Sequence, residues 1–329
     1  MHNSRIVNFR MGIKHLNHYL LKHCSSKAIE KIGLHSLSGK IVVVDISIYI
    51  YKFLAEGSYM EHLYLFLGLF HYYQIMPIFI FDGKPPPEKW DIIKKRQQDK
   101  KAAQKEYAEL IAQNSNPTKI QDKLDSLKKR MVTLKDANLV ETKLLIDAFG
   151  FSYFEAKGEA DELCAYFVLS GIAWACLTDD MDMFLYGCPR IIRNVSMMKK
   201  EAVMYHTESI MCELSIESHA ILVDILLLSG AEYSPDYCIG IENAIQYYCE
   251  YKIIENHTDS HWYYYLLKHF TSHKLPQQYP FMTLYEQFIS VVNKEELHIY
   301  KELYMKQEGR VFQIDKIKEI MSNYGFIFI

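Results

Sequence analysis

The sequence predicts an α/β protein with a mostly parallel central sheet flanked by helices. Short apolar segments of strand length alternate with longer segments that have helical spacing of apolar residues. The expected strands are 40–45, 76–82 and 171–182. The expected helices are 61–73, 88–112, 119–149 and 159–170. Strands that alternate with helices in this way favour parallel pairing through right-handed crossovers.

Each expected strand ends in acidic residues. The first closes on Asp45, the second on Asp82, and the third on Asp179, Asp180 and Asp182. In open parallel sheets the ligand crevice lies at the carboxyl ends of the strands, so we expect these acids at one edge. Carboxylates that lie close together resist ionisation unless a cation is present. The pattern therefore predicts a site for divalent metal.

A further acidic group opens the fourth expected helix, in the sequence GEADELCAYF (158–167). Its acids are Glu159, Asp161 and Glu162. Acids in a first helical turn also complement the helix dipole, so a structural role is the alternative. Helical periodicity places Glu159 on one face with Glu162 rather than with Asp161.

A basic segment follows Asp82. Residues 84–105 contain eight Lys or Arg against three Asp or Glu, and the expected helix after them is also basic. A solvated helix face is the simpler interpretation of such a run. Its position directly after an acid of the expected metal edge instead favours phosphate binding, by two basic helices joined through the polar turn 114–118. No G-x-x-x-x-G-K-[ST] or G-x-G-x-x-G loop offers another route to nucleotide binding.

Bulk properties restrict the class of protein. A chain of 329 residues has one large or two fused domains. Its net charge of −3 gives no overall attraction to nucleic acid, so such a role depends on local patches. Seven cysteines without a C-x-x-C pair are typical of a reducing intracellular compartment. Since His71, Gln74 and Pro77 interrupt the longest apolar stretch, we expect no association with membranes.

Five blocks of the sequence resemble the flap endonuclease/XPG family of structure-specific 5′ nucleases. They are MGIKHLNHYL (11–20), VVVDISIYIYKFL (42–54), PIFIFDGKPPPEK (77–89), GEADELCA (158–165) and LTDDMDMFLYG (177–187). Their order and spacing match over about residues 11–250. The resemblance implies a PIN-like nuclease core with a helical arch and a helix-two-turn-helix element for duplex DNA. It also implies two Mg²⁺ ions per active site, with Mn²⁺ as a substitute.

The resemblance assigns roles to individual residues. The metal-binding carboxylates it implies are Asp45, Asp82, Glu159, Asp161, Asp180, Asp182 and Glu232. It pairs Glu159 with Asp161, against the periodicity argument for Glu162, and we follow the family; Asp179 matches an acid that is not a ligand. The catalytic cations, which also contact DNA, are Lys89 and Arg96. The other DNA-binding positions are Gly12, Tyr51 and Gly240.

Segment 226–245 departs from the family pattern. Glu232 stands where Asp is usual, and Cys238 replaces a glycine shortly before Gly240. Glu242 and Asn243 occupy positions where cations are expected. The sequence therefore predicts weak duplex binding at this element. No sliding-clamp peptide is found, because Arg310 occupies its aliphatic position.

We expect four regions: an N-terminal nuclease region (11–110), a helical arch and return helix (111–149), an internal nuclease region with a degenerate helix-two-turn-helix (150–250), and a C-terminal helical region of unknown role (251–329). The expected function is hydrolysis of DNA at 5′ flaps or junctions, by a monomer, in replication, repair or recombination. The expected location is the nucleus or, for a member from a large DNA virus, the host nucleus or a cytoplasmic replication site. The alternatives are a catalytically inactive nucleic-acid-binding scaffold and a 5′ nuclease that acts on RNA.

Overall fold

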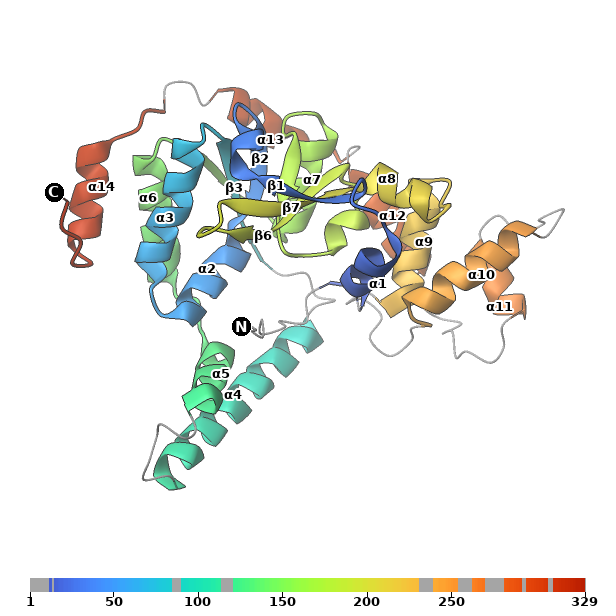
Figure 1. Cartoon of the computed structure of the whole chain (residues 1–329), viewed down its shortest axis with the longest axis horizontal. Coiled ribbons are helices and arrows are strands. Elements are labelled where there is room, and N and C mark those ends of the chain that lie inside the picture. Colours follow the sequence, from blue (N-terminus) through green and yellow to red (C-terminus); the bar gives the residue numbers. More distant parts are fainter. Residues whose placement is uncertain are drawn as a thin grey trace. The chain divides into compact units, whose positions relative to one another are not determined.

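The computed structural model describes residues 12–13, 15–84, 90–113, 121–230, 239–253, 262–269, 281–291, 294–306 and 310–328. In this part of the chain seven strands form one mixed sheet, hydrogen-bonded in the order β1-β7-β6-β5-β2-β3-β4. The strands are β1 (Ile29–Gly33), β2 (Ile41–Asp45), β3 (Met76–Phe81), β4 (Ser152–Glu155), β5 (Ala175–Leu177), β6 (Arg190–Ser196) and β7 (Glu201–His206) (Figure 1). β3 and β4 are parallel, as are β5 and β6, whereas β7 is antiparallel to both of its neighbours. The predicted α/β class is confirmed.

The three strands expected from the sequence are β2, β3 and β5. They are buried because their side chains are almost entirely apolar, and the centre of β2, Val42–Val44, is fully excluded from solvent. The sequence analysis did not predict β1, β4, β6 or β7. β4 has only four residues, and β1 and β6 interleave charged with apolar residues, so these three strands form no continuous apolar run. β7 contains the short apolar run Ala202–Tyr205, which the sequence analysis missed.

The helices of the described residues are α1 (Leu16–His23), α2 (Ile46–Glu56), α3 (Tyr59–Tyr72), α4 (Trp90–Gln113), α5 (Gln121–Met131), α6 (Asp136–Ala148), α7 (Ala160–Leu169), α8 (Thr207–Glu213), α9 (His219–Gly230), α10 (Ile241–Ile253), α11 (Trp262–His269), α12 (Phe281–Ile289), α13 (Glu295–Met305) and α14 (Ile314–Ser322). The single helix expected over 119–149 is wrong, because it is two helices, α5 and α6. They are separated at 132–135, where two β-branched residues occur and Lys135 N donates to Asn138 Oδ1 at 3.1 Å to start the new helix.

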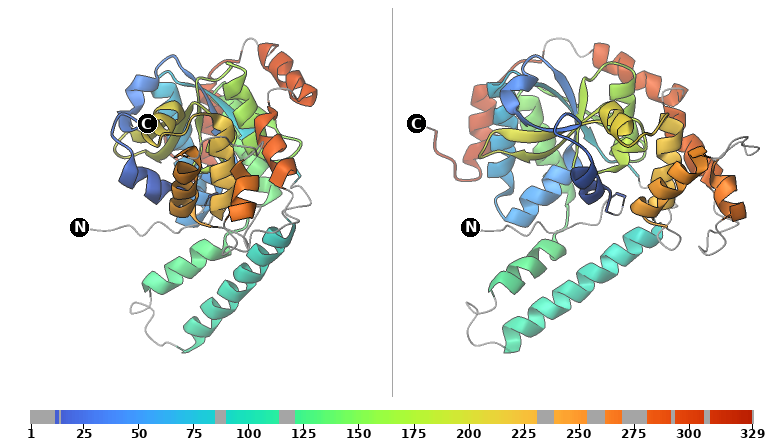
Figure 2. Two further views of the ribbon diagram at one scale, coloured as in Figure 1. Left: turned by 90° about the vertical axis from the view of Figure 1, so that its right-hand side faces the viewer. Right: turned by 45° about the vertical axis from the view of Figure 1, so that its right-hand side comes forward.

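The chain divides into two compact units, and the described residues of the first fall in Val44–Ala160 and Leu303–Ile329. In this unit α4 and α5 lie side by side as a helix pair (Figure 2). Lys123 Nζ lies 2.8 Å from Glu106 Oε1, and Lys100 donates to the Thr133 hydroxyl. These polar contacts hold the pair together along its length.

The C-terminal segment packs against the rest of the first unit. Arg310 donates to Asp147 Oδ1 at 2.7 Å, and Phe312 stacks on His71 with ring centroids 4.0 Å apart. Tyr64 contacts the rings of two further phenylalanines, at 326 and 328. The C-terminal segment therefore covers the side of this unit formed by α3 and α6.

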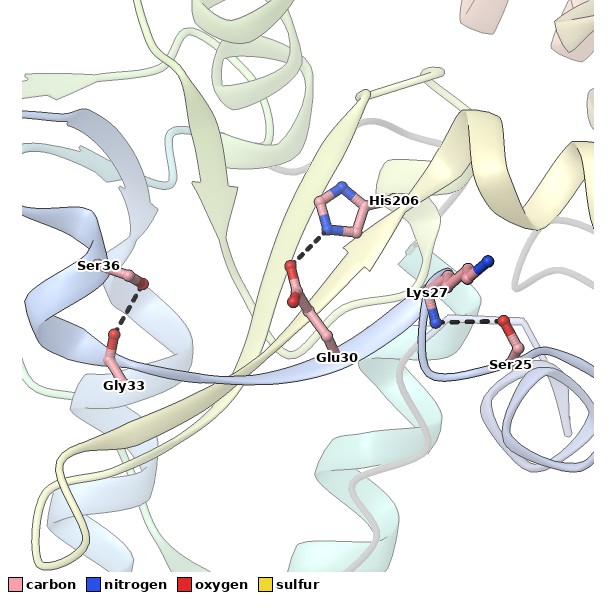
Figure 3. Close-up of polar contacts among 6 residues, drawn as sticks. All are labelled: Ser25, Lys27, Glu30, Gly33, Ser36 and His206. Carbon is pink, nitrogen blue, oxygen red and sulfur yellow. Dashed lines mark hydrogen bonds and ion pairs between the residues drawn. The ribbon is translucent and has the colours of Figure 1, made fainter.

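The second unit contains Arg10–Val43 and Asp161–Glu302. Its outermost strand, β1, pairs with β7, and Glu30 Oε1 lies 2.9 Å from His206 Nε2 (Figure 3). α9 is mostly apolar, although it carries the buried Asp224, and it packs against α10 and α12. Among the helices described in either unit, none combines the length and apolar character needed to cross a bilayer.

Candidate active site

Backbone N–H groups hold Asp45 and Asp82 in the first unit. Asp45 ends β2 and caps α2, because its Oδ1 accepts a hydrogen bond from Ser47 N at 3.1 Å. Asp82 follows β3, and its Oδ1 accepts a hydrogen bond from Ala160 N at 2.9 Å. Ser47 joins the two acids, since its hydroxyl accepts from Asp82 N at 3.5 Å. The structure therefore brings together the acids at the ends of two predicted strands.

The backbone also places Glu159 beside Asp82. Gly83 N donates to Gly158 O at 2.7 Å, so the residues that follow Asp82 and precede Glu159 are hydrogen-bonded. A Cβ at position 83 would lie 2.0 Å from Ala156 O, so this approach requires glycine. Three predicted ligands of the first unit thus form one acidic set: Asp45, Asp82 and Glu159.

Tyr51 and Arg96 lie near this set in the first unit. Burial raises the pKa of the Tyr51 hydroxyl, the charge of Asp82 adds to the rise, and Arg96 opposes it. These influences place the Tyr51 hydroxyl within electrostatic reach of both Asp82 and Arg96. Arg96 is exposed on α4, where it is accessible to an anionic ligand. Lys89, the second expected catalytic cation, lies outside the described residues.

In the second unit Asp180 and Asp182 lie on a tight turn after β5. Asp180 N donates to Thr178 Oγ1 at 3.1 Å, and Asp182 N donates to Asp180 Oδ1 at 2.9 Å. Both side chains are buried, with exposed fractions of 8% and 1%. Gly12 packs directly against them: a Cβ there would lie 2.6 Å from Asp180 Oδ1 and 3.3 Å from Asp182 Oδ1. The backbone of Gly12 also has a φ of +78°, which favours glycine.

Asp161 and Glu162 open α7 in different surroundings. Burial raises the pKa of the Cys188 thiol, and Cys176 and Asp161 add to the rise, so Asp161 lies within electrostatic reach of Cys188. Glu162 forms an ion pair with Lys294, and both side chains are about one quarter exposed (25% and 26%). The Glu162 carboxylate is therefore engaged by a lysine near the start of α13, which the sequence analysis did not single out.

The start of α10 makes contacts within the protein. Gly240 has a φ of +80° and its carbonyl accepts from Ala244 N at 2.9 Å. Asn243 Nδ2 donates to Ile239 O at 2.7 Å, and Glu242 lies 3.9 Å from Lys22 Nζ of α1. The two residues that replace expected cations thus bond to the protein itself. Glu232, the seventh expected ligand, lies outside the described residues.

The acids fit a hard divalent cation by their chemistry, since Mg²⁺ takes oxygen ligands and carboxylates above all. They form two sets: Asp45, Asp82 and Glu159 in the first unit, and Asp161, Asp180 and Asp182 in the second. Within the residues that the structure describes, no group of three or more His, Cys, Asp or Glu is arranged to hold a metal ion. Two features therefore indicate that these acids suit a divalent metal: their oxygen donors and, in the second unit, the burial of Asp180 and Asp182.

Strands that end in carboxylates and a helix pair that carries an exposed arginine are features expected of a metal-dependent nuclease of the α/β class. The comparisons with known proteins agree. The XPG N-terminal domain matches residues 11–103, and the XPG I-region matches residues 150–232.

Curated relatives carry the same family name. The chain is 29% identical to flap endonuclease 1 of Sulfolobus acidocaldarius over 262 residues, which cover 69% of this chain and 72% of that protein. It is 30% identical to flap endonuclease 1 of Xenopus tropicalis over 269 residues, covering 73% and 66% respectively. The chain therefore belongs to the flap endonuclease/XPG family, whose members are metal-dependent nucleases.

Solved structures show the same fold. The catalytic core of Rad2 in complex with DNA substrate has a TM-score of 0.66 at 20% identity, covering 96% of each chain. The Holliday junction-resolving enzyme GEN1 in complex with product DNA and Mg²⁺ has a TM-score of 0.64 at 20% identity, covering 91% of this chain and 72% of that one. The PIN-like nuclease fold expected from the sequence is confirmed.

Proposed function

We propose that the protein is a metal-dependent, structure-specific 5′ nuclease that hydrolyses DNA near single-strand/double-strand junctions. The observation that carries this proposal is the acidic set of the first unit, in which backbone N–H groups fix Asp45 and Asp82, with Tyr51 close enough to feel the charges of both Asp82 and Arg96. A fixed pair of acids suits metal binding, and a nearby exposed guanidinium suits a phosphodiester. Membership of a nuclease family supports the same reaction.

The residues that would hold the metals are the six described acids and Glu232. Mg²⁺ is the expected metal, two ions are expected per active site, and Mn²⁺ is expected to substitute. When bound, such ions supply positive charge that stabilises the phosphodiester in its transition state. Asp45 and Asp82 contribute by staying in place, because the hydrogen bonds from Ser47 N and Ala160 N restrict their rotation.

The cations and the aromatic residue would position the substrate. Arg96 and Lys89 neutralise charge that develops on the scissile phosphate. Tyr51, which is 39% exposed, offers a ring on which a base near the cut stacks. Gly12 and Gly240 have no side chain, so we expect DNA to approach the backbone closely at these two positions. Since Glu242 and Asn243 bond to the protein, contact between the start of α10 and duplex DNA is weak in this proposal.

The test is cleavage of a labelled DNA 5′ flap by the full chain, in Mg²⁺ and in EDTA. We expect cuts near the junction in Mg²⁺ and none in EDTA. A matched flap made of RNA is the second arm, and it should be cut much more slowly.

Two outcomes would replace the proposal. Binding of the flap without any cleavage in Mg²⁺ or Mn²⁺ would identify a catalytically inactive scaffold. Preferential cleavage of the RNA flap would keep the chemistry and change the substrate class.

A further inference from the structure

A buried arginine supports the acidic turn of the second unit. Arg193 lies on β6 and is only 8% exposed. Its Nη2 donates to the carbonyl oxygen of Asp179 at 2.6 Å, and its Nη1 donates to Asn17 Oδ1 at 3.1 Å. The guanidinium carbon also lies 5.6 Å from the centre of the Tyr205 ring. A cation this deeply buried is stable only when such partners replace water.

The Asn17 side chain fixes Arg193 in turn. Its Oδ1 accepts from Tyr205 Oη at 2.6 Å as well as from Arg193. Burial raises the pKa of Tyr205, so the phenol keeps its proton at neutral pH and donates it to this bond. Asn17 belongs to α1, only five positions after Gly12, which packs against Asp180 and Asp182. One short segment therefore contacts the acidic turn directly and through Arg193.

The turn has a second connection to β6. Asp179 Oδ1 accepts from Asn194 N at 2.9 Å, and Asn194 has a φ of +53°. Both the carbonyl and the carboxylate of Asp179 are thus bonded to adjacent residues of one strand. Asp180 follows directly. The residue before a predicted metal ligand is therefore held by its carbonyl and by its side chain.

We propose that Arg193 is a positioning residue for Asp180 and Asp182, held in its own orientation by Asn17 and Tyr205. The inference rests on the proposed function, since these acids are the expected metal ligands. Arg193 acts through the Asp179 carbonyl, which it holds by a charge-assisted hydrogen bond, and it places a positive charge beneath an acid-rich turn. It does not contact the substrate or the metal.

The same strand provides a matched control. Arg190 begins β6, its Nε donates to Trp174 O at 2.8 Å, and its guanidinium lies 4.7 Å from the centre of the Trp174 ring. Arg190 and Arg193 therefore each donate to one carbonyl and lie over one aromatic ring. They differ in the carbonyl they hold, because Trp174 precedes β5 and Asp179 follows it, and Arg193 donates to Asn17 as well.

The experiment compares R193M, R193K, N17A and R190M with the wild type in two assays. The first measures the Mg²⁺ concentration that gives half-maximal flap cleavage. The second measures the rise in thermal unfolding temperature that Mg²⁺ causes without substrate. Outer partners of metal ligands typically change metal affinity about 10–100-fold, and we expect a shift of that size for R193M in both assays.

The other variants define the mechanism. R193K should recover only part of the loss, because an ammonium does not present the planar fork that reaches both acceptors. N17A should shift both midpoints in the same direction by less than R193M. R190M should lower the unfolding temperature without Mg²⁺ but leave both Mg²⁺ midpoints unchanged, since its carbonyl is remote from the acids.

The outcomes separate this inference from the proposed function. If the wild type does not cleave the flap, the proposed function fails, and the thermal assay still decides the inference. The inference would be overturned if the Mg²⁺ midpoints of R193M and R190M agreed within about twofold. If R193M does not fold, wild-type Mg²⁺ midpoints in both R193K and N17A would overturn it equally.

Discussion

Asp45 and Asp82 are held by N–H groups at the starts of helices, whereas Asp180 and Asp182 lie on a turn that a buried arginine supports. The first arrangement uses the partial positive charge of helix N-termini, which every helix provides. The second uses a full charge, which the fold must bury and surround with partners. Asp45 is supported by a residue two positions away, whereas Asp82 depends on Ala160, which is 78 positions away. The acids on the turn depend in addition on a buried charge from β6.

The largest effects should come from the acids themselves, one from each set. We expect D82N and D180N each to reduce flap cleavage by at least about 100-fold, because loss of a ligand exceeds the loss of an outer partner. Flap binding should stay close to that of the wild type. D136N, at the exposed start of α6, is the control and should cleave normally. Mg²⁺-dependent turnover in both D82N and D180N would contradict the assignment.

Arg96 should separate substrate contact from metal support. R96A removes an exposed cation that lies near Tyr51, and we expect cleavage to fall by about 100-fold, a typical cost of losing one donor to the transition state. The Mg²⁺-induced thermal shift should not change, in contrast to the expectation for R193M. K318A, at an exposed position of α14, is the control and should cleave normally. A wild-type cleavage rate for R96A would exclude Arg96 from the active site.

Gly12 tests how closely the second acidic set is packed. In G12A the new methyl group would meet Asp180 Oδ1, so we expect weaker Mg²⁺ binding in addition to backbone strain of about 1–2 kcal/mol. G39A is the matched control, because Gly39 has a similar φ of +70° but no heavy atom within 4 Å of a Cβ. Calorimetric Mg²⁺ titration and urea unfolding measure the two effects. Equal Mg²⁺ affinity in the two variants would show that only strain matters.

Lys294 tests support at the start of α7. K294M leaves the Glu162 carboxylate half-buried without its lysine, and we expect a loss of about 1–2 kcal/mol in the free energy of unfolding. The double variant E162Q/K294M should recover most of this loss, since no unpaired charge remains. Urea unfolding of the two single variants and the double variant measures the coupling. Additive losses would show that the pair contributes nothing.

The smallest effect concerns the turn that follows Asp182. His219 Nε2 donates to Leu185 O at 2.8 Å, and burial lowers the pKa of this histidine below its ordinary 6.5. Because the folded-state pKa is the lower one, this contribution to stability is present above 6.5 and is lost as pH falls through the folded pKa. H219Q should therefore lose less thermal stability than the wild type between about pH 7.5 and about pH 5.5. An unchanged pH dependence would exclude His219 as its source.

The sequence identified the elements whose signal is local. β2, β3 and β5 are continuous apolar runs, and each is followed by an acid, so both the strands and the acidic sets could be predicted. The resemblance to a known family then paired Glu159 with Asp161, while periodicity favoured Glu162. The structure engages Glu162 with Lys294, a contact over 132 positions that no local pattern could indicate.

The missed features depend on distant partners. Arg193 lies in an apolar strand sequence, PRIIRNVS, and a charge in such a run was a signal that it must be paired. Its partners, Asn17 and Asp179, could not be read from that run. The roles assigned to individual residues stay predictions, as do the four regions of the chain. Lys89 and Glu232 lie outside the described residues.

The backbone hydrogen bonds at Gly83 limit which sequence changes this protein can tolerate. Gly83 N bonds to Gly158 O, Lys84 N bonds to Lys157 O at 3.2 Å, and position 83 has no room for a side chain. Insertions, deletions and bulkier residues are therefore excluded between Asp82 and Lys84. Changes in length before α4 are therefore tolerated only after Lys84, so they leave the backbone bonds that place Glu159 beside Asp82 intact.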